Sequence, residues 1–101
     1  MTRNEILSAA ATCVSGEREA DYGSPERNFS RIASLWTTYL EGRSCIQATD
    51  VAAMLALLKI ARIASGNAKQ DNWIDLAGYA ACGGEIESEE INERKTSAFL
   101  L

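Results

Sequence analysis

Residues 50–64 read DVAAMLALLKIARIA, and this stretch decides the fold that the sequence predicts. It consists mostly of alanine, leucine, isoleucine and methionine, and apolar residues fall on nearly every side of the helix that it would form. Since a helix without a polar face is buried among other elements, we expect residues 50–64 to form the central helix of an all-α bundle. Thr49 is the expected N-cap of this helix, because threonine favours that position.

Two more helices are expected before the central one. Thr2 and Glu5 have the spacing of a capping box, which predicts a first helix that runs to about Ser15. The tripeptide Ser24–Glu26 predicts the start of a second helix, because serine favours the N-cap, proline the first helical position and an acid the first turn. Apolar residues at spacings of three and four continue this second helix to a stop near Gly42.

A fourth helix is expected from about Asp71 through Ile86. The chain has 101 residues, of which 47% are hydrophobic and only 7% aromatic, and this composition suits one helical domain better than a β-sandwich. We therefore predict a compact bundle of about four helices over residues 1–87, followed by a polar tail over residues 88–101 that frays or docks on a partner chain. Because four short helices give a thin core, we also expect a homo-oligomer.

The composition also excludes several kinds of chemistry and partner. The chain has no histidine, which removes Ser/His/Asp catalysis and imidazole metal ligands. Cys13, Cys45 and Cys82 lack a C-x-x-C spacing, so we interpret them as small buried hydrophobes. Residues 1–84 hold nine acids and eight bases, which argues against binding to duplex nucleic acid. The apolar run Val51–Leu58 is too short to cross a membrane, and without a secretory signal we expect a cytoplasmic protein.

Lys59 and Arg62 are the cations inside the central helix, and they lie within about 60° of each other around its axis. A buried charge without a partner is costly, so both must meet carboxylates, reach solvent or bind an anion. The nearest acids are Asp71 and Asp75, one helical turn apart on the following helix. These aspartates either neutralise the cations as structural ion pairs or, with room for a ligand beside Gly78, bind Mg²⁺ that holds phosphates.

A second polar cluster occupies residues 17–23, between the first two helices. Loops in such positions often carry function, and this one places charged side chains next to an aromatic ring that can stack on a base. The same residues are also compatible with a simple turn into the second helix. The candidate nucleotide-binding residues of this cluster are Glu17, Arg18, Asp21 and Tyr22.

Two residues of the second helix are further candidates for nucleotide binding. Asn28 either hydrogen-bonds a base edge or solvates the surface. Trp36 either stacks on a base or packs in the core, and we expect the core position for both Trp36 and Trp73 because each falls on an apolar helix face.

Five blocks of the chain carry a family resemblance: EREADYGSP (17–25), IASLW (32–36), DVA (50–52), KIAR (59–62) and DNWIDLAGYA (71–80). Together they resemble a family of small phage and prophage proteins of uncharacterised function. The resemblance covers residues 5 to about 86. It implies a protein that acts in the cytoplasm of the bacterial host.

The last of these blocks is similar in turn to the end of the MazG-like, all-α nucleotide pyrophosphohydrolases and to phage nucleotide-modification-associated proteins. In the MazG-like pattern, four acids on two helices hold the Mg²⁺ that binds a nucleoside triphosphate. Carried over, Asp75 matches the final aspartate, Asn72 stands where the pattern has glutamate, and Asp71 lies next to it. The earlier glutamate pair has no faithful counterpart, because alanine and methionine follow Asp50 at positions 53 and 54.

These observations lead to one main hypothesis, a phage-derived nucleotide-binding protein, with a Mg²⁺-dependent nucleoside triphosphate pyrophosphohydrolase as its enzymatic version. In that version Asp71 and Asp75 are catalytic and hold the metal together with Asp50 or Asp21, while Lys59 and Arg62 bind the phosphates. Two alternatives stay open. One is a non-catalytic protein that sequesters a nucleotide second messenger and so counters host defence. The other is a helical interaction module that clasps a partner.

Overall fold

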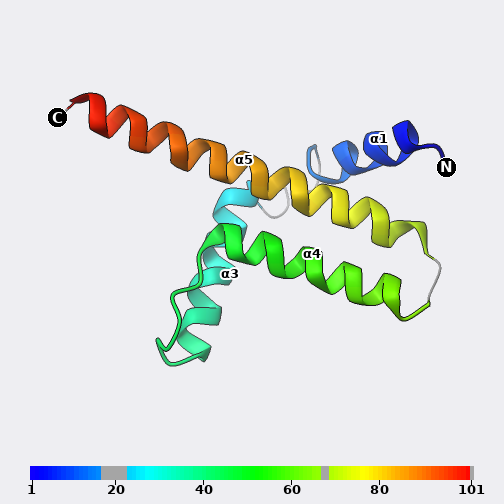
Figure 1. The fold of residues 1–101 in the computed structure, drawn as a ribbon, viewed down its shortest axis with the longest axis horizontal. Helices are drawn as coiled ribbons and strands as arrows, with labels where there is room; N and C mark the ends of the chain where they lie inside the picture. The colour runs from blue at the N-terminus through cyan, green and yellow to red at the C-terminus, as the bar shows by residue number, and fades with distance from the viewer. Residues whose placement is uncertain (17–22, 67–68, 101) are drawn as a thin grey trace.

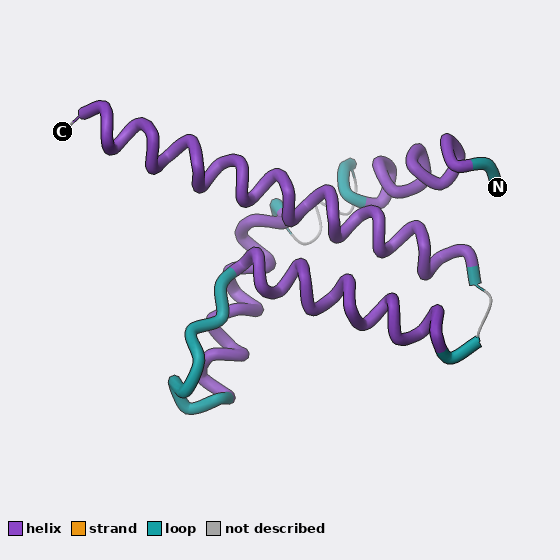
Figure 2. Tube along the Cα trace, in the orientation of Figure 1, coloured by secondary structure: helices purple, strands orange, loops and turns teal. Residues whose placement is uncertain are grey.

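The computed structural model describes residues 1–16, 23–66 and 69–100. The regular elements in this part of the chain are all α-helices, as predicted. The four helices are α1 (Arg3–Cys13), α3 (Pro25–Tyr39), α4 (Ala48–Ala64) and α5 (Gln70–Leu100). Figure 1 shows α4 and α1 on opposite sides of the N-terminal part of α5, while α3 crosses the N-terminal end of α4. Figure 2 shows helices and loops in the described residues and no strand. α5 is therefore the helix that the other three share.

The long α5 makes the molecule elongated. The Cα radius of gyration is 15.5 Å, whereas a compact domain of 100 residues has about 13 Å. The C-terminal part of α5 extends beyond the other helices (Figure 1) and accounts for the difference. The predicted tail over residues 88–101 thus continues the fourth helix through Leu100, and its docking on a partner chain stays a prediction.

The first two helix starts are as predicted. The backbone N–H of Glu5 donates to Thr2 Oγ1 at 3.1 Å, and the Glu5 carboxylate accepts from the backbone N–H of Thr2 at 3.3 Å, which completes the capping box. At the start of α3, Ser24 Oγ accepts from the backbone N–H of Arg27 at 3.3 Å, and Pro25 occupies the first helical position.

The predicted start of the central helix is wrong by two residues. α4 begins at Ala48 with Gln47 as its N-cap, so Thr49 lies inside the helix. The reason is Asp50, whose carboxylate accepts from the backbone N–H of Gln47 at 2.9 Å and so caps the helix from its third position. The earlier start also buries Ala48 in the core.

The sequence predicts a central helix that is buried on every side. In the structure, one face of α4 is exposed. Among the described helices, α5 and α3 pack against it, and the face that they cover holds the buried residues Ala48, Val51, Ala52 and Lys59. The large apolar side chains of the other face stay exposed: Met54, Leu57, Leu58 and Ile60. Most residues of α4 are apolar, but the other described helices are too few to cover all of its sides.

Glycine and alanine let the helices approach α5 closely. A Cβ atom at Gly83 would lie 3.0 Å from the Cβ of Ala52 on α4, and one at Gly78 would lie 3.2 Å from Cγ1 of Val14 beside α1. Larger residues at these two positions would push α4 and α1 away from α5. The core that results is small and built largely from small side chains. Its buried residues are Phe29, Ala33, Ala48, Val51, Ala52, Cys82 and Ile86.

In the part of the chain that is described, no helix has both the length and the hydropathy needed to cross a membrane.

Candidate ligand pocket

A buried ion pair joins the two central helices. Lys59 Nζ on α4 lies 2.9 Å from Asp75 Oδ2 on α5, and the Lys59 residue is only 8% exposed. The Asp75 side chain is 31% exposed, so one end of the pair reaches solvent. The buried ammonium would be costly without a counter-charge, which Asp75 supplies. The prediction that Lys59 meets an acid of the next helix is therefore confirmed.

Arg62 instead follows the second alternative and reaches solvent. Arg62 and Asp71 are both exposed, and neither forms an ion pair with another described residue. Arg62 lies in the last turn of α4 and Asp71 in the first turn of α5, where each charge is favourable toward its own helix dipole without a partner. Of the four charges that the sequence grouped together, the structure pairs two.

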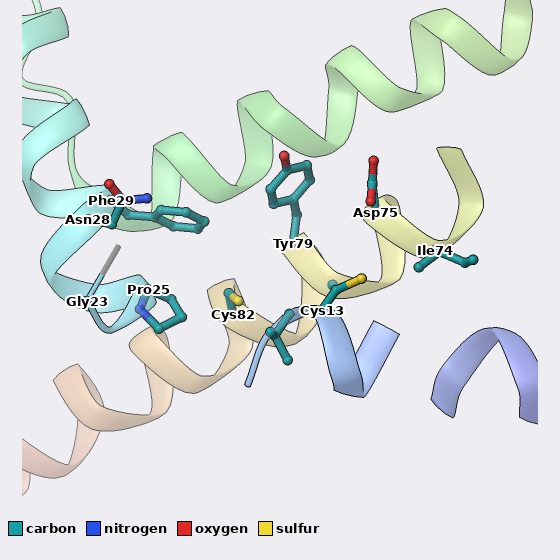
Figure 3. A pocket seen from close by; sticks show the side chains of 11 residues that line it. Cys13, Gly23, Pro25, Asn28, Phe29, Ile74, Asp75, Tyr79 and Cys82 are labelled. Atoms are coloured by element: carbon teal, nitrogen blue, oxygen red, sulfur yellow. The ribbon is translucent and has the colours of Figure 1, made fainter. Parts of the chain in front are cut away.

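Next to the ion pair lies a small pocket between α5, the end of α1 and the start of α3. The residues with polar side chains that line it are Asn28, Asp75 and Tyr79. In Figure 3 the Asp75 carboxylate and the Tyr79 hydroxyl point toward α4, and the Phe29 ring lies beside Tyr79. The centroids of the Phe29 and Tyr79 rings are 6.3 Å apart and the planes are tilted by 50°. The other lining residues are Cys13, Val14, Gly23, Pro25, Ile74, Gly78 and Cys82.

The pocket volume is about 70 Å³. This is room for a few water molecules, and it is well below the roughly 300–1,000 Å³ of sites that enclose a drug-sized ligand. The lining combines two aromatic rings with a carboxylate, which accepts hydrogen bonds, and an amide, which both donates and accepts them. A whole nucleotide does not fit in such a space.

The structure separates the other predicted binding residues. Asn28 is half-buried and lines the pocket. Trp36 is half-buried and packs against the core, as expected, but it does not line the pocket. Trp73 is 53% exposed, so the prediction of a core position for it is wrong. Trp73 lies two positions before Asp75 on α5, so the two side chains are about 160° apart around the helix axis. Trp73 therefore faces away from the Asp75 side of the helix.

Residues 17–22 of the second polar cluster lie outside the described part of the chain, and they include Glu17, Arg18, Asp21 and Tyr22. Val14, which precedes these residues, and Gly23, which follows them, both line the pocket.

The residues expected to hold Mg²⁺ do not come together. Asp50 lies nine residues before Lys59 on α4, about 13 Å along the helix axis, and caps the helix start. Asp75 is engaged by Lys59, and Asp71 is exposed one turn away. Over residues 1–16, 23–66 and 69–100, no three carboxylate, thiol or imidazole side chains are arranged to hold a metal ion. These residues do not fit a magnesium centre.

Sequence reasoning identified part of the pocket. Gly78 and Cys82 share the helix face of Asp75 by their spacing, but Tyr79, four residues after Asp75, was missed although it lies on the same face. Cys13 from α1 carried no signal, because nothing in the sequence shows which side of α5 the first helix covers. Cys82 is buried and Cys13 half-buried, whereas Cys45 is exposed in the loop before α4, against the expectation for all three.

A hollow of about 390 Å³ next to this pocket is acidic, and the sequence analysis missed it. Its lining includes Glu26 of α3 together with Glu85 and Glu89 of α5. The pKa of Glu89 is raised by a hydrogen bond to Glu26, by burial, and by repulsion from Glu26, Glu85 and Glu93. The spacing of four residues between Glu85, Glu89 and Glu93 is the signal that places them on one face.

Comparison with known proteins identifies relatives in phages. The chain is 41% identical over 86 residues to the Gene 55 protein of Mycobacterium phage D29 and 41% identical over 88 residues to that of Mycobacterium phage L5. These alignments cover 85% and 87% of this chain but 56% and 54% of the relatives, so the chain spans a little more than half of their length. No solved structure gives a significant match. A sequence model described as "Domain of unknown function (DUF6378)" matches residues 5–87, and the chain therefore belongs to the DUF6378 family.

Proposed function

We propose that this protein binds a nucleotide or a nucleotide-like small molecule, with its base in the pocket beside Asp75. The observation that carries the proposal is the Asp75 carboxylate, held at 2.9 Å by the buried Lys59 at the edge of a pocket with two aromatic rings. An anchored carboxylate is oriented before a ligand arrives, so little conformational entropy is lost on binding.

The polar groups of the pocket define the kind of base that would bind. An ionised carboxylate only accepts hydrogen bonds, so Asp75 favours a base edge that presents N–H donors. The Asn28 amide both donates and accepts, and it completes the recognition from the opposite helix. The rings of Phe29 and Tyr79 supply apolar contact for the base. Sugar and phosphates would stay outside, because the pocket volume is only about 70 Å³.

The phage relatives and the MazG-like resemblance are compatible with nucleotide chemistry, but the geometry supports binding more than hydrolysis. Hydrolysis through Mg²⁺ requires acids that converge on one ion, and Asp50, Asp71 and Asp75 do not converge. Capture of a nucleotide second messenger without turnover needs no such convergence. Binding without turnover is therefore the form of the function that we propose.

Calorimetric titration of the full chain with nucleoside mono- and triphosphates and cyclic dinucleotides, each with and without Mg²⁺, tests the proposal. We expect saturable binding of at least one of these compounds without Mg²⁺. Asn28→Ala keeps the ion pair intact and should weaken that binding by about tenfold, the effect of one lost hydrogen bond to a polar ligand group. Tyr79→Phe keeps the aromatic contact and should bind nearly as well as the wild-type chain.

Asp71→Asn is the matched control, because Asp71 is the same residue type one turn away on α5 and is exposed. It should bind like the wild-type chain. Absence of heat with every compound contradicts the proposal. Release of pyrophosphate that requires Mg²⁺ and is lost in Asp71→Asn contradicts binding without turnover and instead supports the metal-dependent hydrolase.

A further inference from the structure

The outer face of α4 is apolar along its whole length. Met54, Leu57, Leu58 and Ala61 are spaced three and four residues apart, so they form one strip along the helix, here named the α4 strip. All four residues are exposed, and Leu57 in its middle is 62% exposed. Figure 1 shows α5 along one side of α4 and α3 across its N-terminal end, with neither on the remaining side.

The distribution of charge on α4 is the reverse of that of a surface helix. Between Val51 and Ala61 the helix has one charged residue, Lys59, and this residue is buried against Asp75. A helix that faces solvent carries its charges on the outer side and its apolar residues inside. Exposed apolar patches of this kind mark sites of protein association. The α4 strip thus has the composition of a covered face.

We infer that the α4 strip is covered by the α4 strip of a second copy of this chain, with the two helices antiparallel about a two-fold axis near Leu57. The ends of the strip carry complementary charges. Asp50 lies four residues before Met54 and continues the strip at its N-terminal end. Arg62 directly follows Ala61 and, about 100° around the axis from it, flanks the strip at the other end. Both are exposed, and neither has an ionic partner among the described residues.

An antiparallel pair places Asp50 of each copy next to Arg62 of the other, with only apolar residues between these ends. A parallel pair would place the two Asp50 carboxylates together, where they repel. The antiparallel arrangement also sets the N-terminal end of each helix beside the C-terminal end of the other, which is favourable for the helix dipoles. A surface with an acid at one end, a base at the other and apolar residues between is self-complementary, as a two-fold interface requires.

Leu57→Glu and Leu35→Glu form a matched pair of variants for the test. Leu35 lies on α3 and is 63% exposed, so both substitutions place the same charge on an equally exposed leucine. Sedimentation equilibrium of the full chain over a range of concentrations should show a dimer for the wild-type chain and for Leu35→Glu. Leu57→Glu should weaken dimerisation by at least about tenfold, because the charge would be buried at the centre of the interface.

Cysteine cross-linking tests the geometry of the pair. In a Cys45→Ser background, which removes the exposed native cysteine, Leu57→Cys near the axis should form a covalent dimer under mild oxidation, whereas Leu35→Cys should not. A wild-type chain that is monomeric throughout the concentration range overturns the inference. A dimer that survives Leu57→Glu and does not cross-link through Leu57→Cys overturns it as well, because such a dimer uses another face.

Discussion

Two regions of α5 differ in the charges that meet there. Near its start, Asp75 lies 2.9 Å from the cation Lys59. Fourteen residues later, about 21 Å along the helix, Glu89 meets Glu26 and has Glu85 and Glu93 as further neighbours of the same sign. The first region stabilises the fold through opposite charges and borders the pocket. The second loses stability through like charges, which a proton on Glu89 relieves.

Burial determines how much each of these charges affects stability. Lys59 is 8% exposed, so its ammonium depends on one partner. The carboxylates around Glu89 are close to solvent, which screens their repulsion. We therefore expect changes at the first region to have large effects on stability and changes at the second to have small ones.

Removal of the cation at the first region should have the largest effect. Lys59→Met leaves the Asp75 carboxylate without its counter-charge and should lower the free energy of unfolding by about 2–3 kcal/mol, less than for a fully buried pair because Asp75 is partly exposed. Urea unfolding measures the change. The double variant Lys59→Met with Asp75→Leu removes both charges and should recover most of the loss. A loss below about 0.5 kcal/mol for the single variant would contradict a stabilising role for the pair.

The next largest effect is expected where α4 and α5 touch between the two regions. Gly83→Ala would place a Cβ atom 3.0 Å from the Cβ of Ala52, which is buried in the contact between α4 and α5. We expect a loss of about 1–2 kcal/mol from this overpacking. Gly84→Ala is the matched control, because a Cβ there meets nothing within 4 Å. It should stabilise the chain by about 0.5–1 kcal/mol through helix propensity.

Thermal unfolding of Gly83→Ala and Gly84→Ala measures the change in stability that each substitution causes. Opposite signs for the two alanines support close packing of α4 on α5. A gain in stability from both would show that α4 has room to move.

The smallest effect is expected at the like-charged region. Because the pKa of Glu89 is raised in the folded state, the folded chain binds more protons than the unfolded chain just above the usual carboxyl range, and stability falls as the pH rises through that window. Glu89→Gln removes this loss and should be more stable than the wild-type chain at neutral pH. Below the usual carboxyl pKa the two chains should have the same stability. Glu87→Gln should show no such dependence, and an equal dependence in both variants would contradict the assignment to Glu89.

Much of the fold follows from local rules that the sequence displays. The capping box of Thr2 and Glu5, and the cap formed by Ser24 and Pro25, depend on residues at most three positions apart, so they can be read directly. The spacing of Asp75, Gly78 and Cys82 similarly places them on one face. The pairing of Lys59 with an acid of the next helix follows from the cost of an unpaired buried charge.

What the sequence did not show depends on contacts between distant segments. The position of α1 on α5, which brings Cys13 to the pocket, has no local signal. The exposure of Leu57 on an otherwise apolar helix depends on how many neighbours α4 has in one chain. The sequence also does not show whether Arg62 meets an acid or reaches solvent. An arginine at the C-terminal end of a helix is favourable toward the helix dipole and needs no acidic partner.

In the proposed function, the pocket beside Asp75 receives the base of a nucleotide. Titration of nucleoside triphosphates and cyclic dinucleotides into uniformly ¹⁵N-labelled protein, followed by two-dimensional NMR, tests it most directly. The claim predicts saturable shifts of the Asn28 side-chain amide and of the backbone amides of Gly78 and Tyr79, while the amides around Leu35 stay unchanged. Spectra that do not change with any compound, or shifts restricted to residues away from the pocket, would contradict it.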